Sequence, residues 1–233
     1  MKTFSTIIIA TAMAIGFASQ AAQIITGSAT LNVVYDVEIR SSSPTGVQPS
    51  DGQTIVGVIS SSDIVRGLFH FDTSSLGIPS EATAITVDSI SLTTPNSGVS
   101  LGGIDDLYVY EYAYDFVESS ATWNNPDGVA GGDSTPGGSF NALAPLTYDD
   151  SGYSNLTYTS DFNTVIEDAI LAGGTINLLL KDLGEASTGT GYVRYTEDGF
   201  TLAFDYQYEI PEPSTALLAG LGLMGACFRR RRR

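Results

Sequence analysis

Short runs of β-branched and aromatic residues, separated by Gly, Ser, Asn and Pro, recur between residues 23 and 209. Runs of this kind are typical of short antiparallel strands. The pattern predicts an all-β fold, a single jelly-roll-like antiparallel β-sandwich with one short helix. The eight predicted strands cover residues 29–37, 54–59, 66–71, 84–93, 106–112, 175–181, 191–195 and 201–208.

Alternation of apolar and polar positions is clearest in three of these strands. Successive side chains of a strand point to opposite faces, so each strand should present one apolar face to the core. We expect these core-facing sets to be Phe69 with Phe71, Leu107 with Val109, and Leu202 and Phe204 with Tyr206.

Two segments depart from the strand pattern. Residues 161–172 repeat apolar side chains at three- and four-residue spacing and are followed by Gly173 and Gly174, which predicts a helix that caps one end of the sandwich. Asp161 is placed at or near its N-cap. Residues 126–145 are rich in Gly and Pro and are predicted to form an exposed loop.

The first 22 residues have the pattern of a secretory signal peptide. Lys2 precedes an apolar run over residues 7–17, and small residues follow, so cleavage is expected after Ala21 or Ala22. A membrane anchor is the alternative, but a helix of this length covers only about 16 Å of a hydrocarbon core of about 30 Å. Residues 23–209 are then left as one domain.

Residues 210–233 combine three kinds of chemistry in a fixed order. Pro211, Glu212 and Pro213 break regular structure and keep the segment accessible, an uncharged stretch over residues 215–228 follows, and five arginines end the chain. The apolar stretch favours the bilayer, and the arginines favour its cytoplasmic side. A helix over residues 216–228 is only about 20 Å long, which favours transient insertion over a permanent transmembrane anchor.

This tail resembles the PEP-CTERM sorting domain. The resemblance implies that an exosortase, an intramembrane cysteine transpeptidase, recognises Pro211, Glu212 and Pro213 and cleaves there. It also implies a Gram-negative bacterium that makes extracellular polysaccharide, with the body released or attached at the cell surface or in the extracellular matrix. The cysteine of that reaction belongs to the exosortase and not to Cys227.

Charge and cysteine content exclude some classes of function for this domain. Residues 23–209 hold four basic and 25 acidic residues, a net charge of −21. Such a surface repels phosphate backbones, so nucleic acid is excluded as a partner. Cys227, the single cysteine, lies in the tail, so the domain has no disulfide and no thiolate for catalysis or zinc.

Several stretches of the domain resemble the DNRLRE family of exported domains. They are Arg-Gly-Leu-Phe-His-Phe-Asp at 66–72, Leu-Tyr-Val-Tyr at 107–110, Glu-Ser-Ser-Ala-Thr-Trp-Asn-Asn-Pro at 118–126, the helix leading into 176–180, and residues 194–206. The resemblance implies a jelly roll similar to carbohydrate-binding modules, some of which bind acidic polysaccharides such as alginate. Four basic residues are few for a polyanion, unless a divalent cation bridges the carboxylates.

The candidate sugar-binding residues are aromatic or carry amides. A sugar ring can stack on the indole of Trp123, with Asn124 beside it, although a lone tryptophan in a sandwich also packs in the core and Asn124 and Asn125 also form turns. Tyr108, Tyr110, Tyr112 and Tyr114 alternate and should line one face, either as a stacking platform or as a solvent-facing ladder opposite the core.

Calcium is the one candidate cofactor. Asp105 with Asp106, Asp149 with Asp150, and Glu197 with Asp198 are adjacent acids in predicted loops, where they supply the oxygens that calcium prefers or serve only as solvated charge.

An enzyme is not expected. His70 alternates with two phenylalanines and has no nucleophile motif beside it. We therefore predict a non-enzymatic exported module that binds polysaccharide. A structural or adhesive matrix protein of a biofilm, without a sugar site, is the alternative, and a polysaccharide-degrading enzyme is a weaker one.

Overall fold

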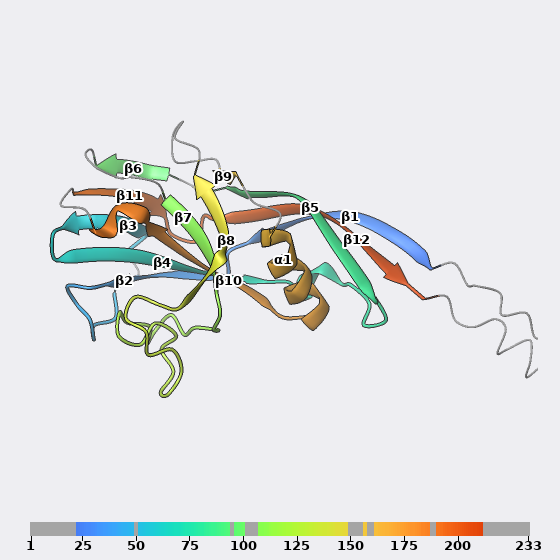
Figure 1. The fold of residues 1–233 in the computed structure, drawn as a ribbon, viewed down its shortest axis with the longest axis horizontal. Helices are drawn as coiled ribbons and strands as arrows, with labels where there is room; N and C mark the ends of the chain where they lie inside the picture. Colours follow the sequence, from blue (N-terminus) through green and yellow to red (C-terminus); the bar gives the residue numbers. More distant parts are fainter. Residues whose placement is uncertain are drawn as a thin grey trace, which may run out of the picture. The chain divides into compact units, whose positions relative to one another are not determined.

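The computed structural model describes residues 22–48, 51–93, 96–100, 107–148, 156–157, 161–186 and 190–211. Residues Ile24–Ile210 form a compact unit. Its described residues fold into two antiparallel β-sheets and a single α-helix, so the predicted all-β sandwich is confirmed (Figure 1).

The smaller sheet has three strands and the larger sheet has nine. The smaller sheet runs in the order β1 (Gln23–Asn32), β12 (Thr201–Ile210), β5 (Ala84–Thr93). The larger sheet runs in the order β6 (Asn96–Ser100), β11 (Gly191–Thr196), β3 (Gln53–Ser60), β4 (Asp63–Asp72), β10 (Thr175–Asp182), β7 (Leu107–Tyr112), β8 (Phe140–Tyr148), β9 (Leu156–Thr157), with β2 (Tyr35–Arg40) paired to β4 off this path. The helices are α1 (Asp161–Ala172) and two short 3-10 helices, η1 (Ser74–Leu76) and η2 (Leu183–Ala186).

The main core is built from both sheets and α1. Six of the seven strand residues expected on its inner faces are buried in it, and the seventh, Tyr206, is partly buried against it. The six buried residues are Phe69, Phe71, Leu107, Val109, Leu202 and Phe204. The alternation of the sequence therefore assigned the inner faces of β4, β7 and β12 correctly.

Helix α1 has the bounds that the three- and four-residue spacing predicted. It buries Phe162, Ile166 and Ile170 in the main core. Gly173 follows with a left-handed φ of 60°, and its amide bonds the carbonyl of Ile170, which ends the helix. Among the described residues, none of the helices has the length and apolar character needed to cross a membrane.

A second core lies on the opposite face of the larger sheet. It joins side chains of β2, β4, β7 and β10 to the segment 113–139, which connects β7 to β8. Its buried members are Val37, Ile39, Leu68, Tyr110, Tyr112, Phe116, Ala121 and Leu179. Both faces of the larger sheet are therefore covered, which the sequence pattern did not predict.

Two predicted segments were wrong in their bounds. The predicted strand 29–37 is divided into β1 and β2, because the chain passes between sheets where Val33 bonds to Phe200 and Val34 to His70. The predicted loop 126–145 ends early, because β8 begins at Phe140. Pro145 is tolerated in β8 because the register with β7 shifts there. Strands β6 and β9 were also not predicted.

Candidate functional site

Three rows of side chains cross the larger sheet on the face of the second core. The strand registers place Arg66 of β4 opposite Ile39 of β2, and Lys181 of β10 opposite Tyr108 of β7. The next row along the strands, formed by Val37, Leu68, Leu179 and Tyr110, is apolar. The row after that contains Tyr35, His70, Asn177 and Tyr112. The apolar row thus separates a cationic end from a polar end.

The cationic end forms what we call the Arg66 cluster, defined as Arg66, Lys181, Glu185, Trp123 and Phe140. The Arg66 guanidinium binds the Glu185 carboxylate through two hydrogen bonds of 2.8 and 2.6 Å, and Lys181 Nζ lies 3.2 Å from the same carboxylate. Arg66 Cζ lies 5.1 Å from the centroid of Trp123, and Lys181 Nζ lies 5.0 Å from that of Phe140. Two cations thus share one carboxylate beside two aromatic rings.

The segment 113–139 is held against this cluster by its backbone. Arg66 donates a third hydrogen bond of 2.7 Å to the carbonyl of Gly137, whose own amide bonds the carbonyl of Trp123. Gly137 has a left-handed φ of 80°, and a Cβ there would lie within 2.9 Å of Arg66 and Trp123. The close approach of this backbone to the cluster therefore requires glycine.

The structure places Trp123 and Asn124 in the middle of a tight turn. Thr122 and Asn125 close the turn through backbone hydrogen bonds of 3.0 and 3.2 Å, as the asparagine pair indicated. Trp123 is half-buried with Arg66 over its ring, and the Asn124 side chain is exposed. An exposed amide thus lies next to a partly accessible indole.

The predicted tyrosines share one face of β7, but their burial differs. Tyr112 is 2 % exposed and donates a 3.0 Å hydrogen bond to Asp133, and Tyr110 is buried against Phe140. Burial, strengthened by the Asp133 charge, holds the pKa of Tyr112 far above its ordinary range. Tyr108 is half-buried and Tyr114 is 40 % exposed, so within this set only these two reach the surface.

His70 is engaged within the polar row. Its Nδ1 lies 2.7 Å from Asn177 Oδ1, and its ring stacks on Tyr35 with centroids 4.3 Å apart. Asn177 in turn donates to Asp115, which also accepts a hydrogen bond from Thr175. The Thr175 bond and, to a lesser extent, the Asn177 bond lower the pKa of the Asp115 carboxyl. The row is a hydrogen-bonded network that joins β4 and β10 to the segment after β7.

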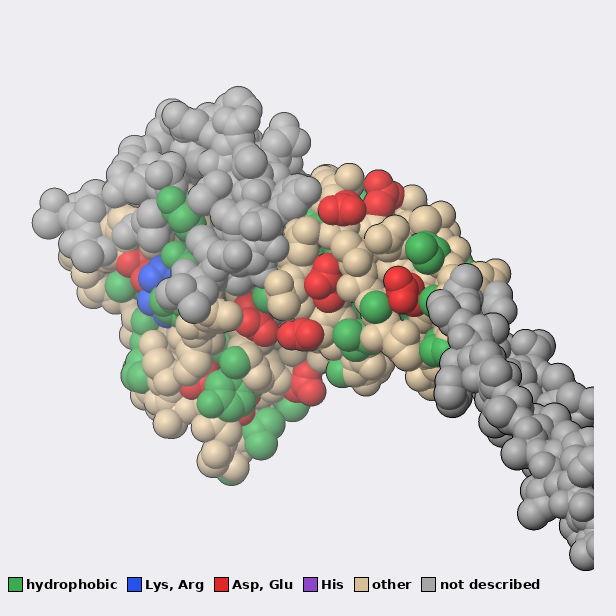
Figure 2. Space-filling view, turned by 45° about the vertical axis from the view of Figure 1, so that its right-hand side comes forward, with side chains coloured by type: hydrophobic (Ala, Val, Ile, Leu, Met, Phe, Trp, Pro, Cys, Tyr) green, Lys and Arg blue, Asp and Glu red, His purple; other side chains and the backbone are tan. Residues whose placement is uncertain are grey.

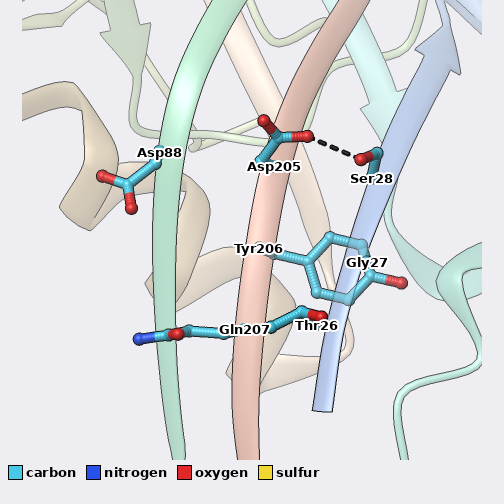
Figure 3. Close-up of a pocket in the computed structure, with 7 residues that line it drawn as sticks. All are labelled: Thr26, Gly27, Ser28, Asp88, Asp205, Tyr206 and Gln207. Atoms are coloured by element: carbon cyan, nitrogen blue, oxygen red, sulfur yellow. Dashed lines mark hydrogen bonds between the residues drawn. The ribbon is translucent and has the colours of Figure 1, made fainter.

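The outer face of the smaller sheet is polar and carries an open groove of about 500 Å³ (Figure 3). Ser28 donates a 2.6 Å hydrogen bond to Asp205, and Asp205 lies opposite Asp88 in the strand register. The Tyr206 ring packs against Gly27 of β1. This groove offers hydroxyls and carboxylates, and the one aromatic residue that lines it, Tyr206, is half-buried against Gly27.

The predicted calcium ligands Asp105, Asp106, Asp149 and Asp150 lie outside the described residues. In the described ranges, no group of three or more His, Cys, Asp or Glu side chains is placed to hold a metal ion. Glu197 accepts a 2.7 Å hydrogen bond from the Gly52 amide. A calcium requirement therefore stays a prediction.

Sequence reasoning named Trp123 but missed the rest of its cluster. Lys181, Glu185 and Phe140 lie 17 or more positions from Trp123 along the chain, and ion pairs and cation–ring contacts of the folded protein bring them to one place. One signal was available, since Arg66 and Lys181 are half of the four basic residues of the domain. In the view of Figure 2, acidic side chains are dispersed over the described surface, and little basic surface is visible.

Comparison with known proteins bears on the end of the chain. No curated protein matches the sequence. Pro211, the last described residue, directly follows β12 and is exposed, whereas Glu212 and Pro213 lie outside the described residues. Residues 209–233 match the PEP-CTERM protein-sorting motif, so the chain carries the signal of an exported protein that an exosortase processes.

Proposed function

We propose that the domain is a non-enzymatic polysaccharide-binding module of a Gram-negative cell surface or extracellular matrix. Its tail inserts transiently into the inner membrane until the exosortase cleaves at Pro211, Glu212 and Pro213. The matched motif supports the delivery step. The DNRLRE-like stretches support the binding step by resemblance alone.

The observation that carries the proposal is the composition of the Arg66 cluster. Trp123, Phe140 and Tyr108 are half-buried, so each offers part of a ring to a sugar, and the exposed Asn124 amide is next to the indole. Arg66 and Lys181 against Glu185 leave one net positive charge in a domain of net charge −21. A uronate or another acidic sugar is the ligand that this local charge favours.

Binding of the mature exported protein to purified bacterial exopolysaccharides tests the proposal. Trp123→Ala should weaken binding at least about tenfold, or about 1.4 kcal/mol, and Asn124→Ala should weaken it without touching the core. Tyr192→Ala is the matched control, because the Tyr192 ring also carries an arginine, Arg194, at 5.1 Å but lies on β11. A wild-type protein that binds no polysaccharide, or an equal loss in the control, contradicts the proposal.

A structural matrix protein without a sugar site is the second candidate. The observation in its favour is that Arg66 already binds Glu185 and the Gly137 carbonyl and stacks on Trp123, as a purely internal clamp would. An enzyme has less support, because the His70 ring is held between Asn177 and Tyr35. The structural candidate would be favoured if deletion of the protein weakened the cohesion of the matrix while the purified protein bound no glycan.

A further inference from the structure

The two edge strands of the smaller sheet, β5 and β1, differ in how well they are protected from pairing with another strand. At β5, the Val87 amide donates a 2.9 Å hydrogen bond to Glu167 of α1, and the Val87 carbonyl accepts a 2.7 Å hydrogen bond from Asn163 of the same helix. Ser89 has a left-handed φ of 55° at a register shift, and the neighbouring Asp88 is exposed. Helix contacts, a bulge and a charge are devices that keep other strands from adding to an edge.

In the described part of the chain, the β1 edge shows no such hydrogen bonds to a helix and carries no charge. Its ten residues, Gln-Ile-Ile-Thr-Gly-Ser-Ala-Thr-Leu-Asn, include no charged residue and no proline. Within the described part of the chain β1 pairs with β12 alone, and Figure 1 shows it at the margin of its sheet. Ile24 at its start is 59 % exposed. An uncharged strand about 33 Å long thus presents a row of backbone groups with which no other described strand pairs.

The described edge strands of the larger sheet differ from β1 in length or in charge. Strand β9 has two residues and β6 has five, and short edges offer few groups for pairing. Strand β2 is longer but carries Asp36, Glu38 and Arg40 in six residues. Among the described strands, β1 is therefore the one long edge without charge.

We propose that β1 pairs antiparallel with β1 of a second copy of this chain, which joins the two smaller sheets into one six-stranded sheet. A two-fold axis perpendicular to the sheet matches like faces, so the exposed hydroxyls of Thr26, Ser28 and Thr30 meet those of the other copy. The capped β5 lies at both far margins, so the assembly closes as a dimer.

The uncharged sequence of β1 favours a second copy as the partner. A charged partner gains no attraction from a strand without charge, whereas β1 of a second copy is equally uncharged and offers the same hydroxyls. Two copies with net charge −21 each repel one another, and β1 is where they approach with no charged side chain of the strand itself between them.

Sedimentation of the mature exported protein tests the proposal. The wild type should be a dimer at about 100 µM, and Thr26→Glu with Thr30→Glu should raise the dissociation constant at least about tenfold by placing like charges across the pair. Thr86→Glu with Ser91→Glu adds the same charge at exposed positions of β5 and should leave the dimer intact. A monomeric wild type, higher oligomers, or an equal effect of the control would overturn the inference.

Disulfide trapping provides a second measurement that does not depend on stability. In a Cys227→Ser background the chain has no other thiol, and residues opposed across an antiparallel pair have the Cα spacing that a disulfide needs. Ser28→Cys, or an equimolar mixture of Thr26→Cys and Ser28→Cys, should give a covalent dimer under mild oxidation, and Thr86→Cys should not. Absence of cross-linking in both, or equal cross-linking of Thr86→Cys, would refute the pairing.

Discussion

Asp36 on β2 is a buried carboxyl group with little to stabilise its charge. It is 1 % exposed, and neither of its oxygens has a hydrogen-bond partner of regular geometry. Burial, together with the charges of Glu197 and Asp198, raises its pKa from 3.8 to about 7, and the nearby Thr54 hydroxyl and Asp198 amide offset only part of this increase. The proton on Asp36 is therefore bound more tightly in the folded protein than in the unfolded chain.

The sign of the pH effect follows from this difference. Because the folded pKa lies above the unfolded value, the contribution of Asp36 to stability is fully present below about pH 4 and is lost as the pH rises towards 7. A pKa change of one is worth about 1.4 kcal/mol, so the loss between these pH values is about 4 kcal/mol as an upper bound. Ionised Asp36 thus destabilises the folded state at pH 8.

Replacing Asp36 with asparagine removes the titration and keeps the size of the side chain. We expect Asp36→Asn to raise the free energy of unfolding by about 2–4 kcal/mol at pH 8 and to change it little at pH 4. Urea unfolding at both pH values measures the two differences. Asp88→Asn is the control, since it removes the same charge from an exposed position. An Asp36→Asn variant that gains no more at pH 8 than at pH 4 would refute the reasoning.

Two further predictions concern the segment 113–139 and the tail. Asp133→Ala leaves the partly buried amide of Ser139 and the buried hydroxyl of Tyr112 without their acceptor, so it should cost about 2–4 kcal/mol in urea unfolding. A loss below about 1 kcal/mol would show that the segment is held by other contacts. Mass spectrometry of the secreted protein should find a C-terminus near Pro211 and none of the terminal arginines, and an intact Arg233 would contradict processing.

The parts of the fold that depend on local periodicity could be predicted. A strand with one buried face alternates whatever its partner, so Phe69 and Phe71 or Leu202 and Phe204 identified their inner faces. Helix α1 was equally visible because its apolar spacing and the glycine after it are local. The division of residues 29–37 between two sheets was not visible, because it depends on which partner strand accepts each backbone group.

The candidate site could be predicted from the sequence even less well than the fold, for the same reason. Tyr108 and Tyr112 alternate as predicted, yet one is half-buried and the other is 2 % exposed, because the segment 113–139 covers only part of their face. The spacing of the four tyrosines does not indicate which of them this segment covers. Likewise, Arg66 and Glu185 are 119 positions apart, and only the pairing of β4 with β10 brings η2 beside Arg66.

Two acidic residues of this domain stabilise one segment of the fold, a role that disulfides or metals often have in other exported domains. Asp127 accepts hydrogen bonds from the amides of Val129 and Asp133. Burial would raise the pKa of Asp133, but hydrogen bonds from the Ser139 and Thr135 amides outweigh it and lower that pKa.

Each of these carboxylates thus ties backbone groups of one long segment to one another. Since both accept hydrogen bonds from protein donors, these carboxylates help to hold the shape of the segment. Part of the high negative charge of the domain is therefore explained by the folding of its longest described connection.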